Sequence, residues 1–138
     1  MKKNILVLCT GNSCRSQMAH GFLNHFGHEK FTVYSAGVEI HGLNPFAMGI
    51  MMEDGIDISS HTSNHLDEYT NITFDYIITV CDHAKESCPV FPSSAIKYHH
   101  NFSDPSKANG TAKEIIEAFR STRSEIKKWC LDFIEKNH

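Results

Sequence analysis

Short apolar runs alternate along the chain with longer stretches in which apolar residues recur at helical spacing. Residues 4–8 form a β-rich apolar run, and residues 18–26 then follow a helical pattern that Gly27 ends. Three further apolar runs predict strands at residues 31–34, 76–80 and 96–98. Residues 35–37 are small and are expected to close the second strand.

Capping signals mark the remaining helices. Asn44 and Pro45 are typical of an N-cap followed by the first helical residue, and Asp54-Gly55 is typical of a helix end. Thr111 and Glu114 form a capping box at the start of the last helix. That helix carries one apolar stripe, made of Ile115, Ile116, Phe119, Ile126, Trp129, Cys130, Phe133 and Ile134.

The order of these elements predicts an α/β fold with a central four-stranded, mostly parallel sheet covered on both faces and flanked by helices. Residues 57–73 and 82–95 lack a strong period and are expected to be irregular. We find no repeat or linker, so residues 1–138 are expected to form one domain. In such folds ligands bind at the carboxyl ends of strands, where both Cys9 and Cys81 are predicted to lie.

Composition narrows the classes of function. The chain has 138 residues, of which 41% are hydrophobic and 21% are charged, and its formal net charge is -3. This balance is typical of a globular protein and gives no sign of a nucleic-acid or anionic-membrane partner. Lys2 and Lys3 precede only four apolar residues before Cys9, fewer than the roughly 7–15 of a secretory signal. We therefore expect a cytosolic protein.

The segment at residues 9–16 has the pattern Cys, five residues, Arg, and lies where a predicted strand meets a predicted helix. Such a loop can turn successive N–H groups inward to form an anion nest, and Arg15 can add two parallel N–H donors to a tetrahedral oxyanion. The same field is expected to lower the pKa of Cys9. Ser16 can donate a hydrogen bond to the Cys9 thiolate, and Gly11 and Asn12 tolerate a left-handed backbone.

An ordinary turn with a buried cysteine is the alternative interpretation of this loop, and a Walker-type loop is excluded because the Gly-Lys-Ser/Thr ending is missing. Cys14 is expected to pack away from the anion. The residues expected to bind the oxyanion are Thr10, Gly11, Asn12, Ser13, Cys14, Arg15 and Ser16.

The chain has five cysteines, an odd number that argues against a framework of structural disulfides. Six residues separate Cys81 from Cys88. The two could be metal ligands, inert core thiols or a redox pair, and the polar segment between them favours chemistry. Cys130 lies on the apolar stripe of the last helix and is expected to be a core residue.

The string at residues 9–19, Cys-Thr-Gly-Asn-Ser-Cys-Arg-Ser-Gln-Met-Ala, resembles the phosphate loop of the low-molecular-weight protein tyrosine phosphatase superfamily. Within that superfamily, the chain resembles the thioredoxin-coupled arsenate reductases. The segments at 33–37, 41–45 and 55–59 also fit that group. The resemblance extends from residue 4 to about residue 130 and is weakest at 83–103 and 105–112.

The resemblance implies reduction of arsenate to arsenite. Cys9 would attack arsenic, and Asp104, which precedes Pro105, would act as the general acid, although an Asp-Pro pair is usually only a turn. Cys81 would then form a disulfide with Cys9, and Cys88 would attack Cys81. The resulting Cys81–Cys88 disulfide would be reduced by thioredoxin. The implied protein acts as a monomer.

Two other functions remain open. A low-molecular-weight protein tyrosine phosphatase would use Cys9, Arg15 and Asp104 in the same way, but it would not need Cys81 and Cys88. Such phosphatases tend to carry tyrosines after the Asp-Pro pair, whereas Ser-Lys-Ala follows here at residues 106–108. The third possibility is a non-enzymatic oxyanion or redox sensor.

The sequence gives little sign of a metal or potassium site. Some members of the resembled family bind potassium through Asn, Glu, Ser and Asp, whose matching positions here are Asn12, His20, Ser35 and Asn64. Two carboxylates are missing, so we expect no tight potassium site. His20 is expected to be a solvated helix residue, or else a cation near the loop. The histidine pairs 61/65 and 99/100 do not indicate a metal site, so no bound metal and no cofactor are expected.

Overall fold

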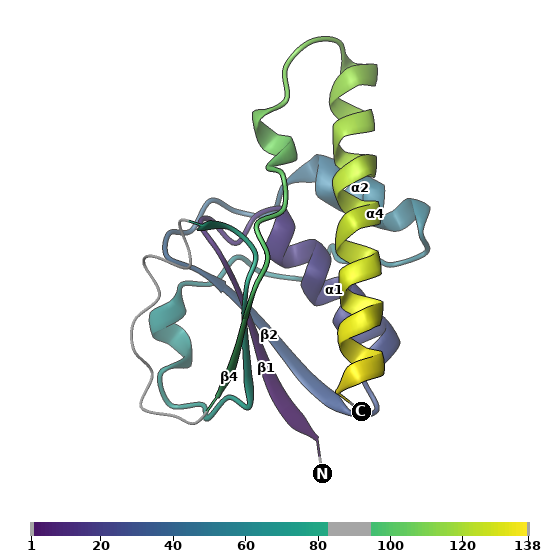
Figure 1. Cartoon of the computed structure of the whole chain (residues 1–138). Helices are drawn as coiled ribbons and strands as arrows, with labels where there is room; N and C mark the ends of the chain where they lie inside the picture. Colours follow the sequence, from purple (N-terminus) through teal and green to yellow (C-terminus); the bar gives the residue numbers. More distant parts are fainter. Residues whose placement is uncertain (1, 83–94, 138) are drawn as a thin grey trace.

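Four parallel strands form one sheet in the order β2-β1-β3-β4 (Figure 1). In this computed structural model, which describes residues 2–82 and 95–137, the strands are β1 (Lys3–Cys9), β2 (Phe31–Gly37), β3 (Tyr76–Thr79) and β4 (Ile96–His99). The predicted α/β fold class is confirmed. Because β1 lies between two neighbours, Ile5 to Leu8 are fully buried, which explains their unbroken apolar run.

The strand β2 is three residues longer than the sequence pattern predicts. Ser35, Ala36 and Gly37 do not close the strand, because they continue its pairing with β1 as far as Cys9. All three are buried. Backbone pairing with a central strand has therefore overridden the weak strand propensity of small residues. The extension carries Gly37 to the position directly beside Cys9.

Three α-helices belong to the described part of the chain: α1 (Arg15–Gly27), α2 (Pro45–Glu53) and α4 (Ala112–Lys136). Phe31 of β2 contacts Phe133 of α4, with ring centroids 5.8 Å apart, so α4 covers that face of the sheet beside α1 (Figure 1). Tyr34 points to the opposite face and contacts Tyr69 at 5.3 Å. The predicted caps are confirmed, since Asn44 Oδ1 accepts from Phe46 N at 2.8 Å.

Among residues 2–82 and 95–137, irregular chain packs on the second face of the sheet, where Tyr69 and Phe74 contact Tyr34. Residues 57–73 are irregular, as predicted, apart from the 3₁₀-helix η1 (Leu66–Tyr69). A second 3₁₀-helix, η2 (Pro105–Lys107), leads toward α4, whose capping box of Thr111 and Glu114 is confirmed. Of the predicted irregular stretch 82–95, residues 83–94 lie outside the described residues.

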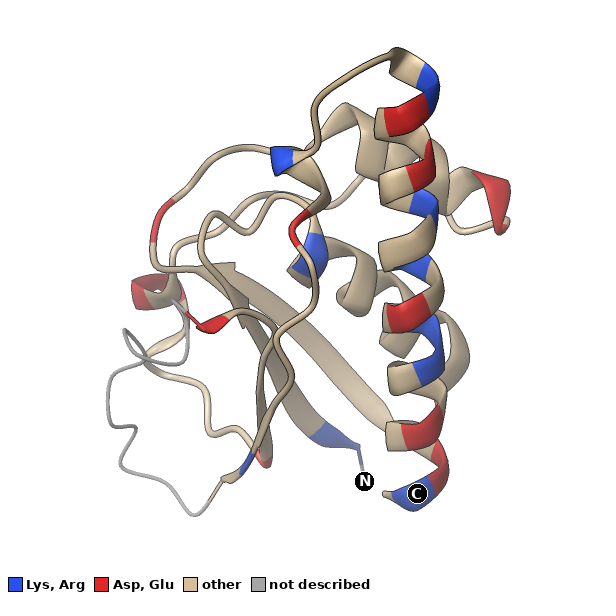
Figure 2. Cartoon of the chain, turned by 45° about the horizontal axis from the view of Figure 1, so that its top comes forward, with Lys and Arg blue, Asp and Glu red and all other residues tan. Residues whose placement is uncertain are grey.

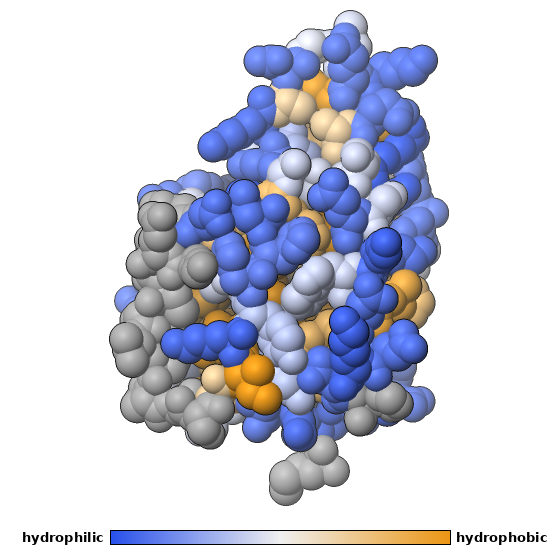
Figure 3. Space-filling view, viewed as in Figure 1, coloured by the Kyte–Doolittle hydropathy of each residue, from blue (hydrophilic) through white to orange (hydrophobic). Residues whose placement is uncertain are grey.

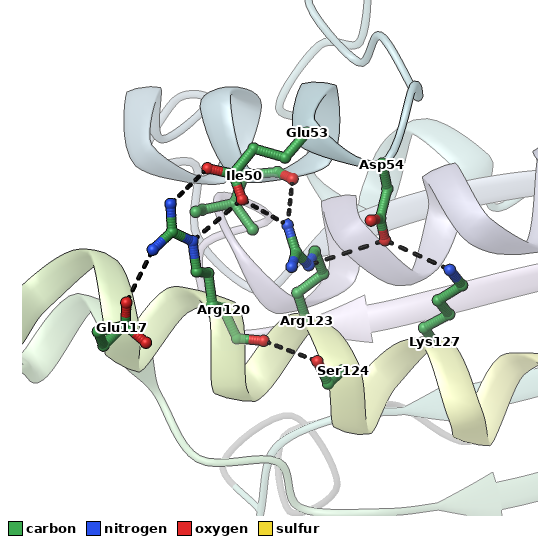
Figure 4. A network of polar contacts seen from close by, with 8 residues as sticks. All are labelled: Ile50, Glu53, Asp54, Glu117, Arg120, Arg123, Ser124 and Lys127. Atoms are coloured by element: carbon green, nitrogen blue, oxygen red, sulfur yellow. Dashed lines mark hydrogen bonds and ion pairs between the residues drawn. The ribbon is translucent and has the colours of Figure 1, made fainter.

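An ion-pair network joins α2 to α4 (Figure 4). Arg120 donates two hydrogen bonds to Glu53, from Nε at 3.1 Å and from Nη2 at 2.8 Å. Arg123 Nη1 donates to Glu53 at 2.9 Å and to the carbonyl of Ile50 at 2.8 Å. Hydrogen bonds from Arg120 and Arg123 lower the pKa of Glu53 to about 2. The network is exposed, so it fixes the orientation of α2 more than it adds to stability.

Charged residues of both signs are interspersed along α4 (Figure 2). The face of the molecule seen in Figure 1 is mostly hydrophilic, with small apolar areas between polar groups (Figure 3). Among the helices of residues 2–82 and 95–137, we find none with the length and apolar character needed to cross a membrane.

Two glycines at α2 should respond in opposite directions to substitution by alanine. Gly55, just after the helix, has a φ of +75°, so Gly55→Ala should lower the free energy of unfolding by about 1 kcal/mol. Gly49 is exposed within α2 and a Cβ would meet nothing within 4 Å, so Gly49→Ala should raise it by about 0.5–1 kcal/mol. Urea denaturation measures both, and a shift of the same sign in both variants would contradict the assignment.

Candidate active site

The carbonyl groups of the loop after β1 are bound from outside the loop. Backbone N–H groups of the segment after β2 donate to three of them: Glu39 to Thr10 at 2.9 Å, His41 to Gly11 at 3.0 Å and Asn44 to Ser13 at 3.2 Å. Gln17 Nε2 donates to the carbonyl of Asn12 at 3.1 Å. Because each trans peptide directs its N–H opposite to its carbonyl, the loop amides face inward. This is the arrangement of an anion nest at a helix N-terminus.

The curl of the loop depends on Asn12, which is fully buried and has a φ of +49°. Its Oδ1 accepts a hydrogen bond from Ser16 Oγ at 2.8 Å, and its Nδ2 donates to the carbonyl of Ser35 at 3.2 Å. The left-handed backbone expected at Asn12 is confirmed. The hydrogen bond expected from Ser16 to the Cys9 thiolate is wrong here, because the Ser16 hydroxyl instead fixes the Asn12 side chain.

At two glycines, Gly11 and Gly37, a Cβ atom would collide with neighbouring atoms of the site. A Cβ at Gly11 would lie within 3 Å of three atoms of the His41 side chain, so close approach explains this glycine, whose φ is not positive. The left-handed conformation expected at Gly11 is therefore wrong. A Cβ at Gly37 would lie 2.7 Å from the carbonyl oxygen of Thr10 and 2.8 Å from the backbone nitrogen of Asn12. Gly37 thus allows the end of β2 to lie against the loop.

Cys9 and Cys81 meet beside this loop, as their strand-end positions predicted. Both side chains are buried, and the Cys81 thiol lies close enough to Cys9 to raise its pKa. Thr10 Oγ1 also lies 3.3 Å from Cys81 Sγ. Val80 N donates to the carbonyl of Leu8 at 3.0 Å, so the backbone just before Cys81 is held beside β1. Seventy-one residues of sequence separate two thiols that the parallel strands bring together.

The pKa of Cys9 is raised in this arrangement. The hydrogen bond with Cys81 and burial of the thiol raise the pKa, whereas the positive charge of Arg15 and the N–H of Thr10 lower it. The expected net lowering is therefore wrong for the reduced pair, because the neighbouring thiol and burial outweigh the loop's favourable field. The two expected effects that lower the pKa of Cys9, from the charge of Arg15 and from the N–H of Thr10, are present.

Arg15 links the loop to the chain after β4. Its Nη1 donates to the carbonyl of Phe102 at 2.9 Å, and its Nη2 lies 3.5 Å from Asp104 Oδ2. Asp104 Oδ1 accepts from Ser106 N at 3.0 Å and so caps η2. The Asp-Pro turn thus holds a carboxylate against the guanidinium of the loop.

A cavity of about 610 Å³ opens over the loop, and both thiol and carboxylate groups line it. Its walls include Cys9, Cys14, Arg15, His41, Asp82 and Asp104. Cys14 is among the residues that line this cavity, and its side chain belongs to the buried core, as expected of a packing residue. Burial raises the pKa of Cys14 to about 11, which keeps it a neutral thiol. The cavity has the size of a small-molecule site.

The other cysteines have different positions. Cys130 is fully buried in α4, and burial raises its pKa, so its assignment to the core is confirmed. Cys88, the predicted partner of Cys81, lies outside the described residues. The structure therefore brings together Cys9, Arg15, Cys81 and Asp104 of the five predicted catalytic residues.

His20 is not a cation, and it is only partly exposed to solvent. Its Nδ1 lies 2.8 Å from Ser35 Oγ, and its ring stacks on His61 with centroids 4.3 Å apart. Burial, followed by the nearby His61, lowers the pKa of His20 to about 3, so the ring is neutral. His61 Nδ1 in turn lies 3.0 Å from Gln17 Oε1. These two rings contact Ser35 and Gln17, which in turn hydrogen-bond to Asn12 of the loop.

Several contributors to the site were missed in the sequence, namely Gln17, Gly37, His41, Asp82 and His99. Gly37 lies in the small-residue stretch after a predicted strand, where a glycine is a signal for close backbone approach. Gln17 and His41 belong to segments that matched the resembled family. Nothing in the local pattern marks Asp82 or His99, because their partners are distant in sequence.

The Gly37→Ala substitution should disrupt the loop. The added Cβ meets backbone atoms of Thr10 and Asn12, which cannot move without turning loop amides, so phosphate affinity should fall at least about tenfold. Isothermal titration with inorganic phosphate measures the effect, with Gly49→Ala as a control that adds the same methyl group to an exposed helix position. Unchanged phosphate affinity in Gly37→Ala would contradict the role assigned to Gly37.

The buried histidine predicts a stability loss in acid. The unfolded chain binds a proton at His20 below its ordinary pKa of 6.5, whereas the folded chain does so only near 3. The free energy of unfolding should therefore fall with decreasing pH across this window, by up to about 1.4 kcal/mol per pH unit from this residue. Urea denaturation at several pH values should show a shallower loss in His20→Gln; equal slopes would contradict the prediction.

Comparison with known proteins agrees with this geometry. Residues 4–137 match the model of the low molecular weight phosphotyrosine protein phosphatase family. The chain is 47% identical to an arsenate reductase of Halalkalibacterium halodurans over 134 residues, which cover 97% of this chain and 96% of the relative.

Two solved structures have the same fold. One is an arsenate reductase in the oxidized state, with 32% identity, a TM-score of 0.82 and coverage of 99% of this chain and 98% of the other. The second is an arsenate reductase in the phosphate binding state, with 30% identity, a TM-score of 0.81 and coverage of 99% of both chains. With its Cys-x5-Arg loop and its adjacent thiol at Cys81, the chain belongs to the low molecular weight phosphotyrosine protein phosphatase family, within which it groups with the arsenate reductases.

Proposed function

We propose that this protein reduces arsenate to arsenite, with Cys9 as the nucleophile and Cys81 as the thiol that releases the product. The observation that supports this most strongly is the close approach of these two thiols at the side of an anion nest. A phosphatase needs only one of them. The names of the relatives, which are arsenate reductases at 44–49% identity, support the same substrate.

In the first step the oxyanion binds over the loop, where inward N–H groups and Arg15 stabilise its charge. Cys9 attacks arsenic as the thiolate, and one oxygen leaves as water after Asp104 donates a proton. The raised pKa of Cys9 in the reduced pair means that the thiolate must form at the expense of the Cys9–Cys81 hydrogen bond. Arg15 and the N–H of Thr10 favour that ionised form.

In the second step the Cys81 thiolate attacks the sulfur of the Cys9–arsenic adduct. The Cys9–Cys81 disulfide bond forms while the sulfur–arsenic bond breaks. The bonding electron pair stays on arsenic, which is thereby reduced from arsenic(V) and leaves as arsenite. The two thiols supply the two electrons.

The third step regenerates the nucleophile through a residue outside the described part of the chain. Cys88 attacks Cys81, which frees Cys9 and leaves a Cys81–Cys88 disulfide. A thioredoxin-type dithiol then reduces this disulfide.

In this proposal neither metal nor potassium takes part in the reaction. The protein acts as a monomer in the cytosol, where reduced thiols persist.

A second candidate function is hydrolysis of aryl phosphates. The pairing of Arg15 with Asp104 over Cys9 favours it, since these three groups suffice for a phospho-cysteine mechanism. Arsenate and phosphate have the same tetrahedral shape, so one loop accepts both. Hydrolysis would leave the contact between Cys9 and Cys81 without a use.

The deciding measurement is NADPH consumption with thioredoxin, thioredoxin reductase and arsenate. The wild type should turn over continuously, and Cys88→Ser should stop after one turnover, because its Cys9–Cys81 disulfide is not resolved. Cys130→Ala is the matched control, since it also removes one thiol but from the core of α4.

Two other results would contradict the proposal. Hydrolysis of an aryl phosphate that is indifferent to Cys88→Ser, without arsenate turnover, would identify a phosphatase. Binding of phosphate without either activity would identify an oxyanion sensor.

A further inference from the structure

We propose that Asp82 and His99 are positioning residues that hold Cys81 against Cys9 for the disulfide step. This inference rests on the proposed role of Cys81 as the attacking thiol. It concerns two side chains beyond the loop and beyond the Asp104 turn.

The backbone on both sides of Cys81 is tied to the chain that continues from β4. On one side, Phe102 N donates to the carbonyl of Val80 at 3.2 Å. On the other side, Asp82 N donates to Asn101 Oδ1 at 3.3 Å. Cys81 thus lies between two anchored residues.

His99 adds a side-chain bridge across the same position. Its Nε2 lies 2.8 Å from Asp82 Oδ1, and its Nδ1 lies 2.7 Å from Thr79 Oγ1. A carboxylate only accepts hydrogen bonds, so Nε2 donates to Asp82, and Nδ1 makes the contact with the Thr79 hydroxyl. Thr79 is buried and is the register partner of His99. The ring therefore connects the last residue of β3 with the residue that follows Cys81.

The contact between His99 and Asp82 is not explained by packing of the core. The Asp82 side chain is 66% exposed, so it contributes little to the core. Disulfide formation requires Cα atoms about 4.4–6.8 Å apart and a specific direction of each Cβ. A misplacement of about 1 Å can slow a reaction between held groups by about a hundredfold. Anchoring Asp82 limits the directions that the Cys81 thiol can take, and keeps it beside Cys9 and Thr10.

The same extension of β4 also reaches the loop. The carbonyl of Phe102 accepts from Arg15, and the N–H of Phe102 donates to Val80. One short segment, residues 99–102, therefore contacts both the anion-binding arginine and the backbone around the attacking thiol.

The test uses Asp82→Ala and His99→Gln in a Cys88→Ser background, in which the Cys9–Cys81 disulfide accumulates. After a single turnover with arsenate, the samples are alkylated and the disulfide is quantified by mass spectrometry. Both variants should form it about tenfold to a hundredfold more slowly than the parent. The rate of Cys9 alkylation should stay within about twofold, and phosphate affinity should not fall. His28→Gln is the matched control, since His28 is exposed just after α1.

A second arm repeats the comparison with diamide, which takes up the two electrons and two protons of a dithiol. If arsenate produces no disulfide in the parent, the proposed function fails, and the diamide rates alone decide the positioning role. Parental rates in Asp82→Ala with both oxidants would overturn the inference. An equal loss of phosphate affinity, alkylation and disulfide formation would also overturn it, because the residues would then only stabilise the fold.

Discussion

The outward hydrogen bonding of the loop carbonyls is the constraint on which the site depends. Three N–H groups from residues 39–44 and the side chain of Gln17 hold these carbonyls, so the loop amides have only the inward direction left. The donors can reach the loop because β2 continues to Gly37, which has no Cβ to collide with it. The anion nest is therefore a property of the contact between two segments, and not of the loop alone.

The order of the strands then supplies the second thiol. With β1 between β2 and β3, the carboxyl ends of β1 and β3 lie side by side. Cys9 is the last residue of β1, and Cys81 comes two residues after the end of β3. Burial and the neighbouring Cys81 thiol raise the pKa of Cys9, whereas Arg15 and the N–H of Thr10 lower it. These opposed effects on the pKa suit the two steps proposed for Cys9. It must first ionise away from Cys81 to attack the oxyanion, and it must then form a disulfide with Cys81.

Support for the loop comes from neutral groups as well as from charged ones. Beneath it, the stacked rings of His20 and His61 reach Ser35 and Gln17, and burial keeps His20 uncharged. Above it, Arg15 is oriented by a carbonyl and a carboxylate from the chain after β4. The exposed ion pairs between α2 and α4 lie away from the loop. They hold α2, which begins directly after Asn44, the last of the backbone donors to the loop.

The sequence by itself determined what local pattern encodes: four apolar strands, the helix caps at Asn44 and Thr111, and the Cys-x5-Arg loop between a strand and a helix. These features depend on neighbours within a few residues, so periodicity and turn chemistry reveal them. Only the tertiary structure decided the end of β2, the partner of Ser16, the burial of His20, and the bridge from Asp82 to His99. Each follows from contacts between segments distant in sequence or from packing around the loop. The direction of the Cys9 pKa shift was decided in the same way, because a thiol 72 positions further along the chain outweighs the adjacent loop.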